Sequence, residues 1–385
     1  MKRFNGIALS VAFCSLASQA ALAQTKIDTL KVQNLNEVIV KGVRAAKEAP
    51  YAVANIRKSE LKQFSCSGQE LPFLLSRTPG ILAWSENGIG TGTTYMRIRG
   101  AAGSRINVTL DGVALNSPED QTVFWANMNS YSSLLGSIQV QRGVGSSTNG
   151  DGAFGGSISM ATAAPSLTPT AEVTGSFGSY NTYHTGASFS TGLLGKHLIF
   201  DGAYHETATD GYVDGTAGRS GSYYGGLTWL GDNFKVSYKN IGNFEKTGQA
   251  WNGVLGGDYN SNFSLLQDGI RTYKDMYKAG LDKFNVLTGD MVRNGKGDYT
   301  ITPYTLRDGS KWDKTTDNFY QNHNILSATW TPGSHWSHSL SLHYTYGYGY
   351  YKEFKNNAKF AKFGLVYKDA EGKKVVAVLS GGNMD

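Results

Sequence analysis

The chain has 385 residues, among them 36 Lys and Arg, 30 Asp and Glu, and two cysteines. Loss of the leader predicted below removes Lys2 and Arg3 and leaves a net charge of +4, which is too small and too dispersed for a nucleic-acid partner. The remaining cysteine, Cys66, has no partner for an intramolecular disulfide. The 48 glycines and 22 tyrosines are high counts for this length and favour strands and turns.

The N-terminus predicts export. Two cations precede the apolar run 7–16, and Ala21-Leu22-Ala23 then gives the small-residue pattern of a cleavage site. The run is too short to cross a bilayer as a helix, so residues 1–23 are predicted to be a signal peptide. No later apolar run reaches the length of a membrane helix, so a location in a membrane would require a barrel.

Residues 24–50 form a polar lead-in that contains one β-branched segment, Val38-Ile39-Val40. The segment has two interpretations. It is the first strand of the following domain, or it is a strand donated to the sheet edge of another protein, where main-chain hydrogen bonds supply the affinity. Composition alone favours the first interpretation.

Residues 51–165 are predicted to form a compact α+β domain. Helical turns are expected at 59–61 and 68–75, the second ending before Pro79-Gly80. Strands are expected at 95–100 and 106–110, with Asp111-Gly112 as the turn signal. The stretch 137–162 then predicts a hairpin, in which glycines after the first strand permit tight turns and close backbone approach.

Two long loops of this domain carry candidate ligand-binding residues. The first is Gly-rich and contributes Trp84, Glu86, Asn87 and Tyr95, and the second contributes Asp120, Phe124 and Trp125. A few polar groups among aromatic rings are the usual composition of a small-ligand pocket. The alternative, that Phe124 and Trp125 only pack this domain against its neighbour, stays open.

From residue 171 onward, large and small or polar residues alternate with a period of two. In 336–348 the large side chains fall mostly on even positions, and 197–204 and 234–239 repeat the pattern. Strands of about ten residues with aromatic ends and a polar second face suit a barrel with a lipid-facing band and a polar lumen. Seven strands are predicted, near 171–178, 182–191, 197–206, 221–230, 234–245, 323–331 and 335–350.

The connections agree with a barrel. Tight turns at 194–196, 231–233 and 332–334 alternate with connections at 179–181, 207–220 and 246–322, of which the last two are long. Seven strands cannot close around a domain of this size, so the chain is expected to be the N-terminal portion of a longer protein. The predicted fold class is thus a transmembrane antiparallel β-barrel, incomplete here, with the α+β domain in its lumen.

A series of motifs resembles those of TonB-dependent outer-membrane receptors. Leu35-Asn36-Glu37-Val38-Ile39-Val40-Lys41-Gly42 resembles their TonB box. The segments LLSRTPGI (74–81), MRIRG (96–100), VTLDGV (108–113) and IQVQRG (138–143) resemble successive motifs of the plug domain, and NGDGAFGGSI (149–158) resembles the motif that closes it. This series covers residues 35–165 in order, and Gln139 and Val144 depart from the family's usual Glu and Pro.

The resemblance implies energy-coupled import into the periplasm. The TonB protein of the inner membrane would grip residues 35–40 by strand addition and remodel the plug. This implication raises the donated-strand interpretation above its alternative. Arg97, Arg99 and Arg142 are then expected to hold the plug against acidic groups of the barrel wall, and surface charge is the alternative. The two loops described above would bind the cargo at the outer side.

The cargo expected from the resemblance is an iron–siderophore complex, with cobalamin or an oligosaccharide as alternatives. Haem is disfavoured because residues 24–183 contain no His. Expected partners are TonB, the cargo and outer-membrane lipid, with a surface lipoprotein left open, and no cofactor or resident metal is predicted. The domains are predicted as 1–23 signal peptide, 24–50 periplasmic segment, 51–165 plug and 166–385 barrel.

Other classes of protein fit less well. A passive porin would lack the TonB box and the plug motifs, and an exported glycan-active enzyme would bury its strands against another sheet. No nucleophile elbow, HExxH or framed pair of acids is present, so the chain is predicted not to be an enzyme. The G-x-G-x-x-G at 150–155 precedes a strand rather than a helix, which argues against a dinucleotide site. His335 and His338 would lie on opposite faces of a strand, which argues against a shared metal.

Overall fold

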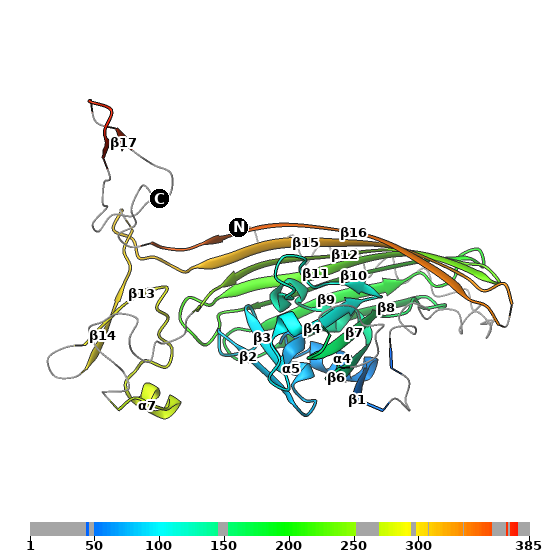
Figure 1. Cartoon of the computed structure of the whole chain (residues 1–385), viewed down its shortest axis with the longest axis horizontal. Helices are drawn as coiled ribbons and strands as arrows, with labels where there is room; N and C mark the ends of the chain where they lie inside the picture. Colours follow the sequence, from blue (N-terminus) through cyan, green and yellow to red (C-terminus); the bar gives the residue numbers. More distant parts are fainter. Residues whose placement is uncertain are drawn as a thin grey trace.

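The computed structural model describes residues 44–45, 50–144, 153–251, 269–293, 298–306, 308–333, 335–355, 367–368 and 370–375. These residues form a small mixed domain that lies against the inner face of a long curved sheet (Figure 1). The predicted signal peptide and TonB box lie outside the described residues. No helix in the described ranges has the length and apolar character needed to cross a membrane.

In its described residues, the mixed domain, called the plug below, contains five short helices and seven strands. The helices are α4 (Lys58–Ser65), α5 (Leu71–Leu75), η1 (Gly103–Arg105), η2 (Trp125–Met128) and α6 (Tyr131–Leu134). The strands are β1 (Ala52–Arg57), β2 (Ile81–Ser85), β3 (Thr94–Ile98), β4 (Ile106–Leu110), β5 (Val113–Ala114), β6 (Leu135–Arg142) and β7 (Gly156–Thr162). Five of these strands form one sheet in the order β1-β6-β7-β4-β5, and β2 pairs with β3.

The predicted hairpin at 137–162 is present as the antiparallel pair β6–β7. Ile138 and Val140 of β6 alternate with polar residues and are fully buried in the plug core. Gly155 permits a close approach, because a Cβ there would lie 2.6 Å from the carbonyl oxygen of Arg105. The sequence did not predict that β7 also pairs in parallel with β4, which places 106–110 beside 156–160.

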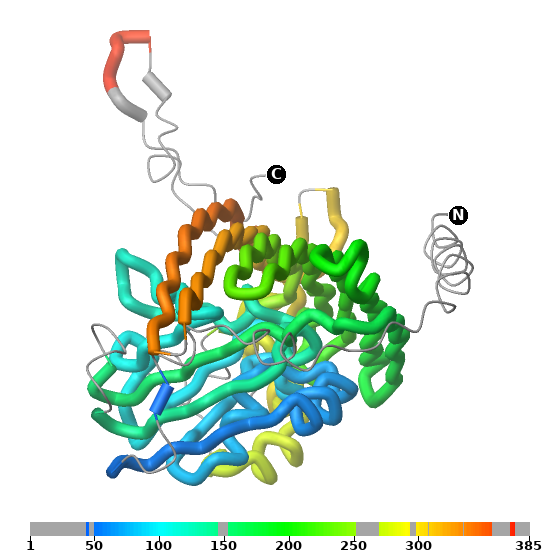
Figure 2. The backbone as a smooth tube through the Cα atoms, turned by 90° about the vertical axis from the view of Figure 1, so that its right-hand side faces the viewer, coloured from blue at the N-terminus to red at the C-terminus, as the bar shows by residue number. Residues whose placement is uncertain are grey.

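The curved sheet, called the wall below, contains seven antiparallel strands in sequence order. They are β8 (Thr170–Phe177), β9 (Tyr183–Ser190), β10 (Leu198–Thr209), β11 (Gly218–Leu230), β12 (Phe234–Gly248), β15 (Thr316–Trp330) and β16 (His338–Lys352). A strand is present at each of the seven predicted positions, and β10, β11, β12, β15 and β16 extend further toward the long connections than the alternation indicated. Seen end-on, the wall curves around one side of the plug (Figure 2).

The two faces of the wall differ in the way the alternation predicts. On β12, Phe234 and Tyr238 are about 40% exposed on the outer face, while Lys235, Ser237 and Lys239 are buried on the inner face, where Lys239 contacts the plug. Apolar side chains outside and polar ones inside are the reverse of a soluble core, and they match a lipid-facing band around a polar lumen.

One end of the wall carries the long connections. The loop between β12 and β15 contains α7 (Tyr273–Lys278), β13 (Gly289–Arg293) and β14 (Tyr299–Pro303), and it extends beyond the sheet (Figure 1, left). The short pair β17 (Tyr367–Lys368) and β18 (Lys374–Val375) follows β16. The tight turns between strands lie at the other end. The wall therefore has long connections at one end and tight turns at the opposite end.

Candidate functional site: the plug apex and its contacts with the wall

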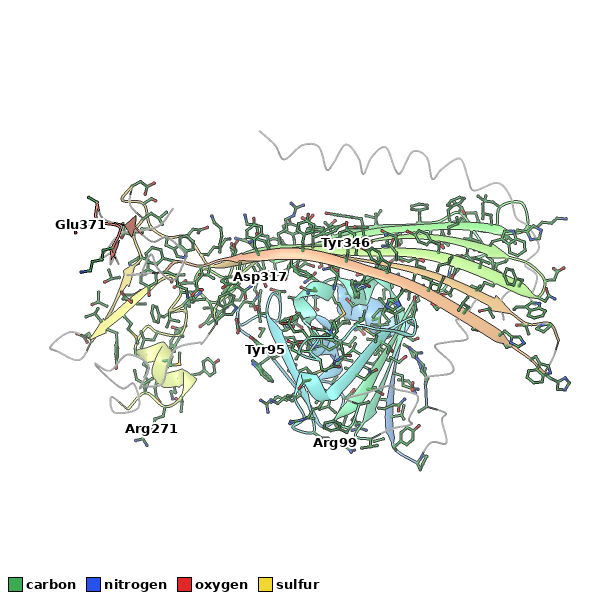
Figure 3. The ribbon with its side chains drawn as sticks, turned by 45° about the horizontal axis from the view of Figure 1, so that its top comes forward. Tyr95, Arg99, Arg271, Asp317, Tyr346 and Glu371 are labelled. Carbon is green, nitrogen blue, oxygen red and sulfur yellow. The ribbon has the colours of Figure 1, made fainter. Side chains whose placement is uncertain are left out.

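The β2–β3 hairpin brings three predicted ligand residues together. Trp84 and Tyr95 are cross-strand partners whose rings stack with centroids 5.3 Å apart, and each is 39% exposed. The Tyr95 hydroxyl donates a 2.7 Å hydrogen bond to Glu86 Oε1. Burial and the bond from Tyr95 oppose each other, and burial prevails, so the pKa of the Glu86 carboxyl is raised. The hairpin therefore presents an aromatic face beside one carboxyl group, and Tyr95 of this face is labelled in Figure 3.

Asn87 has a different position from the other candidates in this loop. It is 3% exposed, and its Oδ1 accepts hydrogen bonds from the backbone N–H groups of Ile89 and Gly90 at 3.1 and 3.2 Å. Its own carbonyl accepts a bond from the Tyr212 N–H at 3.0 Å in the β10–β11 loop. Asn87 thus shapes the apical loop and joins it to the wall, and its burial argues against direct contact with a ligand.

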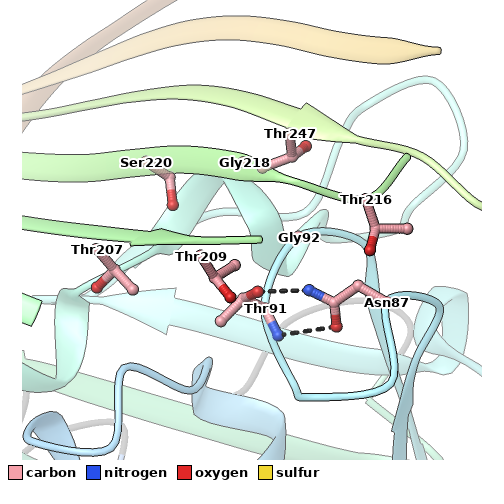
Figure 4. A pocket seen from close by; sticks show the side chains of 9 residues that line it. All are labelled: Asn87, Thr91, Gly92, Thr207, Thr209, Thr216, Gly218, Ser220 and Thr247. Atoms are coloured by element: carbon pink, nitrogen blue, oxygen red, sulfur yellow. Dashed lines mark hydrogen bonds between the residues drawn. The ribbon is translucent and has the colours of Figure 1, made fainter. Parts of the chain in front are cut away.

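A small cavity lies between this loop and the wall (Figure 4). Hydroxyl groups dominate its lining, and the only other side chain there is the Asn87 amide. The lining residues are Asn87, Thr91, Gly92, Thr207, Thr209, Thr216, Gly218, Ser220 and Thr247. A small cavity that is lined mainly by hydroxyl groups suits ordered water rather than a nutrient molecule.

The second candidate loop is divided between the surface and the core. Asp120 is exposed and accepts hydrogen bonds from the N–H and hydroxyl of Thr122, which stabilise a local turn. Phe124 is 62% exposed, whereas Trp125 is 6% exposed and belongs to the core that the plug shares with Ile241 and Ile325 of the wall. For Trp125 the packing alternative is therefore favoured, and Phe124 stays a candidate for ligand contact.

The three arginines expected to hold the plug do not contact the described strands of the wall. Arg97 and Arg99 are exposed, and Arg99 lies on the side of the plug that faces away from the wall (Figure 3). Arg142 Nη1 donates a 2.7 Å hydrogen bond to the Pro79 carbonyl within the plug. The expected role of Arg97, Arg99 and Arg142 in holding the plug against the barrel wall stays a prediction.

Plug and wall are joined by an exposed ion pair between Lys62 and Glu172 at 2.7 Å and by a buried one that the sequence did not predict. Lys239 Nζ of β12 lies 2.9 Å from Asp111 Oδ2 and 2.9 Å from the Thr162 hydroxyl, with 7% and 1% of the two charged side chains exposed. Burial alone would raise the pKa of the Asp111 carboxyl, but Lys239 and two hydrogen bonds from Thr162 outweigh it and hold the pKa below its ordinary value. The sequence predicts Asp111 only as part of a turn, and it predicts Lys239 only as one of the polar residues on the inner face of a strand. It does not predict that the two side chains form an ion pair.

A second missed group is Glu70, at the start of α5. It is 2% exposed, and its Oε2 accepts a hydrogen bond from the Thr94 hydroxyl. Burial raises the pKa of its carboxyl to about 8, although its hydrogen bonds act in the opposite direction. Glu70 is a single acidic residue in the predicted helical turn 68–75, and the sequence pattern of this turn did not predict that its side chain is buried. The plug therefore contains a carboxyl group that stays protonated at neutral pH.

The first described residues after the predicted TonB box lie on the β6–β7 hairpin. The Arg44 guanidinium donates hydrogen bonds to the hydroxyl and carbonyl oxygens of Ser137 and Ser159, at 2.9 to 3.3 Å. Gln139 bonds both backbone groups of Ala45, accepting from the N–H at 2.7 Å and donating to the carbonyl at 3.2 Å. Gln139, noted in the sequence as a departure, thus contacts the lead-in rather than the wall.

The outer connections add aromatic and polar groups above the apex. Trp251 Nε1 donates to Gln249 Oε1 at 2.9 Å, and the Thr93 hydroxyl of the plug bonds the same oxygen. In the β12–β15 loop, the Tyr304 ring stacks on Phe354 at 4.8 Å. No group of three or more His, Cys, Asp or Glu is placed to hold a metal ion in the described ranges.

Comparison with known proteins assigns the two parts of the fold. Residues 45–157 match the family described as TonB-dependent Receptor Plug Domain, and no curated protein matches the chain. The ferric-catecholate import receptor Fiu from E. coli K12 is similar in structure with a TM-score of 0.59 at 12% identity, over 89% of this chain and 44% of that one.

Two further receptors share the architecture at equally low identity. The ferric yersiniabactin uptake receptor FyuA from Yersinia pestis gives a TM-score of 0.54 at 13% identity, over 81% of this chain and 44% of that one. The alcaligin outer-membrane receptor FauA from Bordetella pertussis gives 0.53 at 11%, over 80% and 41%. This chain thus spans about two-fifths of the length of these receptors, and at such identities the likeness shows the fold alone.

These matches confirm the predicted fold class, an antiparallel barrel wall, open in the described residues, with an α+β plug on its inner face. The family match identifies residues 45–157 as a TonB-dependent receptor plug domain, and the whole described chain shares the fold of the receptors named above.

Proposed function

We propose that this chain supplies the plug and part of the barrel wall of an outer-membrane transporter that imports a ferric siderophore with energy from TonB. The outward apolar and inward polar faces of the wall support a location in lipid, with the plug filling the lumen. The fold neighbours named above are described as receptors for ferric catecholate, ferric yersiniabactin and alcaligin. That description supports iron complexes as the first cargo to test.

The observation that carries the proposal is the arrangement of the plug at both ends. At its apex, the Trp84–Tyr95 face opens toward the side of the long connections. On the β6–β7 hairpin, Arg44 forms hydrogen bonds that hold the lead-in following the predicted TonB box. A ligand face and a pulling point on one plug are what energy-coupled import requires, because ligand selection and remodelling must act on the same domain.

Growth of a deletion strain across nutrient sources tests the cargo. We expect a growth defect with one or more ferric siderophores as the only iron source, restored by the gene on a plasmid. The same strain is compared on cobalamin and on oligosaccharides, which are the alternative cargoes. An iron-independent defect on one of these would contradict the siderophore assignment while leaving TonB-dependent import in place.

A further inference from the structure

The polar face of the β6–β7 hairpin is unusual for a surface of the plug because its side chains are almost completely buried. Gln139 is 4% exposed, and Ser157 and Ser159 are each 4% exposed, although these residues point away from the Ile138 and Val140 side of the hairpin. A buried polar face must have its hydrogen-bonding groups paired to avoid a loss of stability. Residues 44–45 provide part of that pairing.

Residues 44–45 contact the hairpin through directed hydrogen bonds rather than through general packing. Arg44 makes four hydrogen bonds that join Ser137 of β6 to Ser159 of β7, so its guanidinium bridges the two strands of the hairpin. Gln139 uses both ends of its amide on Ala45 and also donates to Asn55 Oδ1 at 2.9 Å. A carboxylate at position 139 accepts hydrogen bonds and donates none, so Glu would lose the bonds to the Ala45 carbonyl and to Asn55.

The same site lies close to the ion pair between plug and wall. Burial lowers the pKa of the Arg44 guanidinium, and attraction to Asp111 acts in the opposite direction. Asp111 therefore interacts with two cations, the half-buried Arg44 from the lead-in and the buried Lys239 from the wall. Withdrawal of Arg44 removes one of these cations and uncovers the polar face beside the ion pair.

Chain order decides which contact bears a load first. Force applied at residues 35–42 reaches residues 44–45 before any other described residue of the plug. This order of opening rests on the proposed function, in which TonB pulls at residues 35–42. We propose that Arg44 and Gln139 form a clasp that holds the lead-in on the β6–β7 hairpin, and that this clasp is the first contact of the plug to open when TonB pulls.

Limited trypsin digestion of the purified receptor in detergent tests the clasp without TonB or cargo. Trypsin cuts after Arg44, and a guanidinium held by four hydrogen bonds is protected while the clasp is closed. We expect cleavage at the Arg44–Ala45 bond, identified by the mass of the products, to be about tenfold faster in Gln139→Leu. Gln139→Glu and Ser137→Ala keep part of the bonding and should give smaller increases. Gln63→Leu, at an exposed position of α4, is the matched control.

Single-molecule pulling from the N-terminus tests the order of opening. The wild-type receptor should show an early low-force event that lengthens the chain by less than about 2 nm, which is the fully extended length of the residues between Ala45 and β1 before their folded separation is subtracted. The Gln139→Leu receptor should lack this event and keep the later ones. Equal cleavage rates in all variants, or an unchanged first event in Gln139→Leu, would overturn the clasp. A loss of import on deletion of 35–42 would still support the proposed function in that case.

Discussion

Asp111 adopts a left-handed backbone conformation with φ near +50°, which positions its carboxylate between the end of β7 and the wall. Both partners of the Asp111–Lys239 pair are buried, so each charge depends on the other for compensation. The turn itself was predictable from Asp111-Gly112. The pairing was not, because the two residues are 128 positions apart and the register of plug against wall has no local signal in the sequence.

Lys239→Met should destabilise the contact of the plug with the wall by about 3–5 kcal/mol, because it leaves the Asp111 carboxylate buried without its cation. The expected result is a leakier plug, measured as entry of a large antibiotic that the intact outer membrane excludes. The double variant Asp111→Asn/Lys239→Met removes both charges and should be less leaky than Lys239→Met alone. Equal leakage in the single and double variants would argue against the ion pair as the source of the effect.

Glu70 predicts a pH dependence of stability. Its pKa is raised from 4.5 to about 8, so the unfolded chain releases this proton at a lower pH than the folded plug does. The contribution of Glu70 is complete below about pH 4.5 and is lost as the pH rises toward 8, an effect of a few kcal/mol at most since each pKa unit corresponds to about 1.4 kcal/mol. Calorimetry of purified Glu70→Gln from pH 5 to 9 should show a flatter stability profile, while exposed Glu119→Gln should leave the profile unchanged.

Secondary-structure elements differ in how far they could be predicted. The wall strands were found because alternation with a period of two reports directly which face each residue occupies. Strands β1 and β2 were missed because neither segment shows a regular alternation of apolar and polar residues. The Gly-rich loop at 84–94 is a hairpin, because the partners Trp84 and Tyr95 close it and positive-φ glycines such as Gly90 form its tip.

Trp84→Ala should weaken cargo binding by about tenfold without destabilising the plug, because the ring is exposed and its loss removes a stacking surface. Tyr95→Phe keeps the ring and removes the hydrogen bond to Glu86, so a smaller loss is expected. Binding of labelled ferric siderophore to cells measures both effects. Phe154→Ala changes an exposed aromatic of the plug outside this hairpin and should bind normally, and a wild-type affinity in Trp84→Ala would exclude the hairpin as the ligand face.

At the scale of the whole molecule, the motif series predicted the combination of plug and wall, and the wall pattern predicted which face carries the apolar side chains. Contacts between the two domains could not be predicted in the same way. Arg97, Arg99 and Arg142 were chosen by sequence position within motifs, whereas the described interface uses Asp111, Lys239 and the shared core with Trp125. Contacts between plug and wall join side chains that are far apart in the sequence. A single sequence does not show which of these residues pair.

In the proposed function, import depends on TonB acting at residues 35–42. The most direct measurement compares binding and uptake of iron-labelled siderophore in cells that carry the wild-type receptor or a receptor that lacks residues 35–42. Deletion of 25–32 in the same lead-in is the matched control. The account predicts normal surface binding by all three receptors and loss of uptake only when 35–42 is removed. Unchanged uptake without residues 35–42 would contradict it.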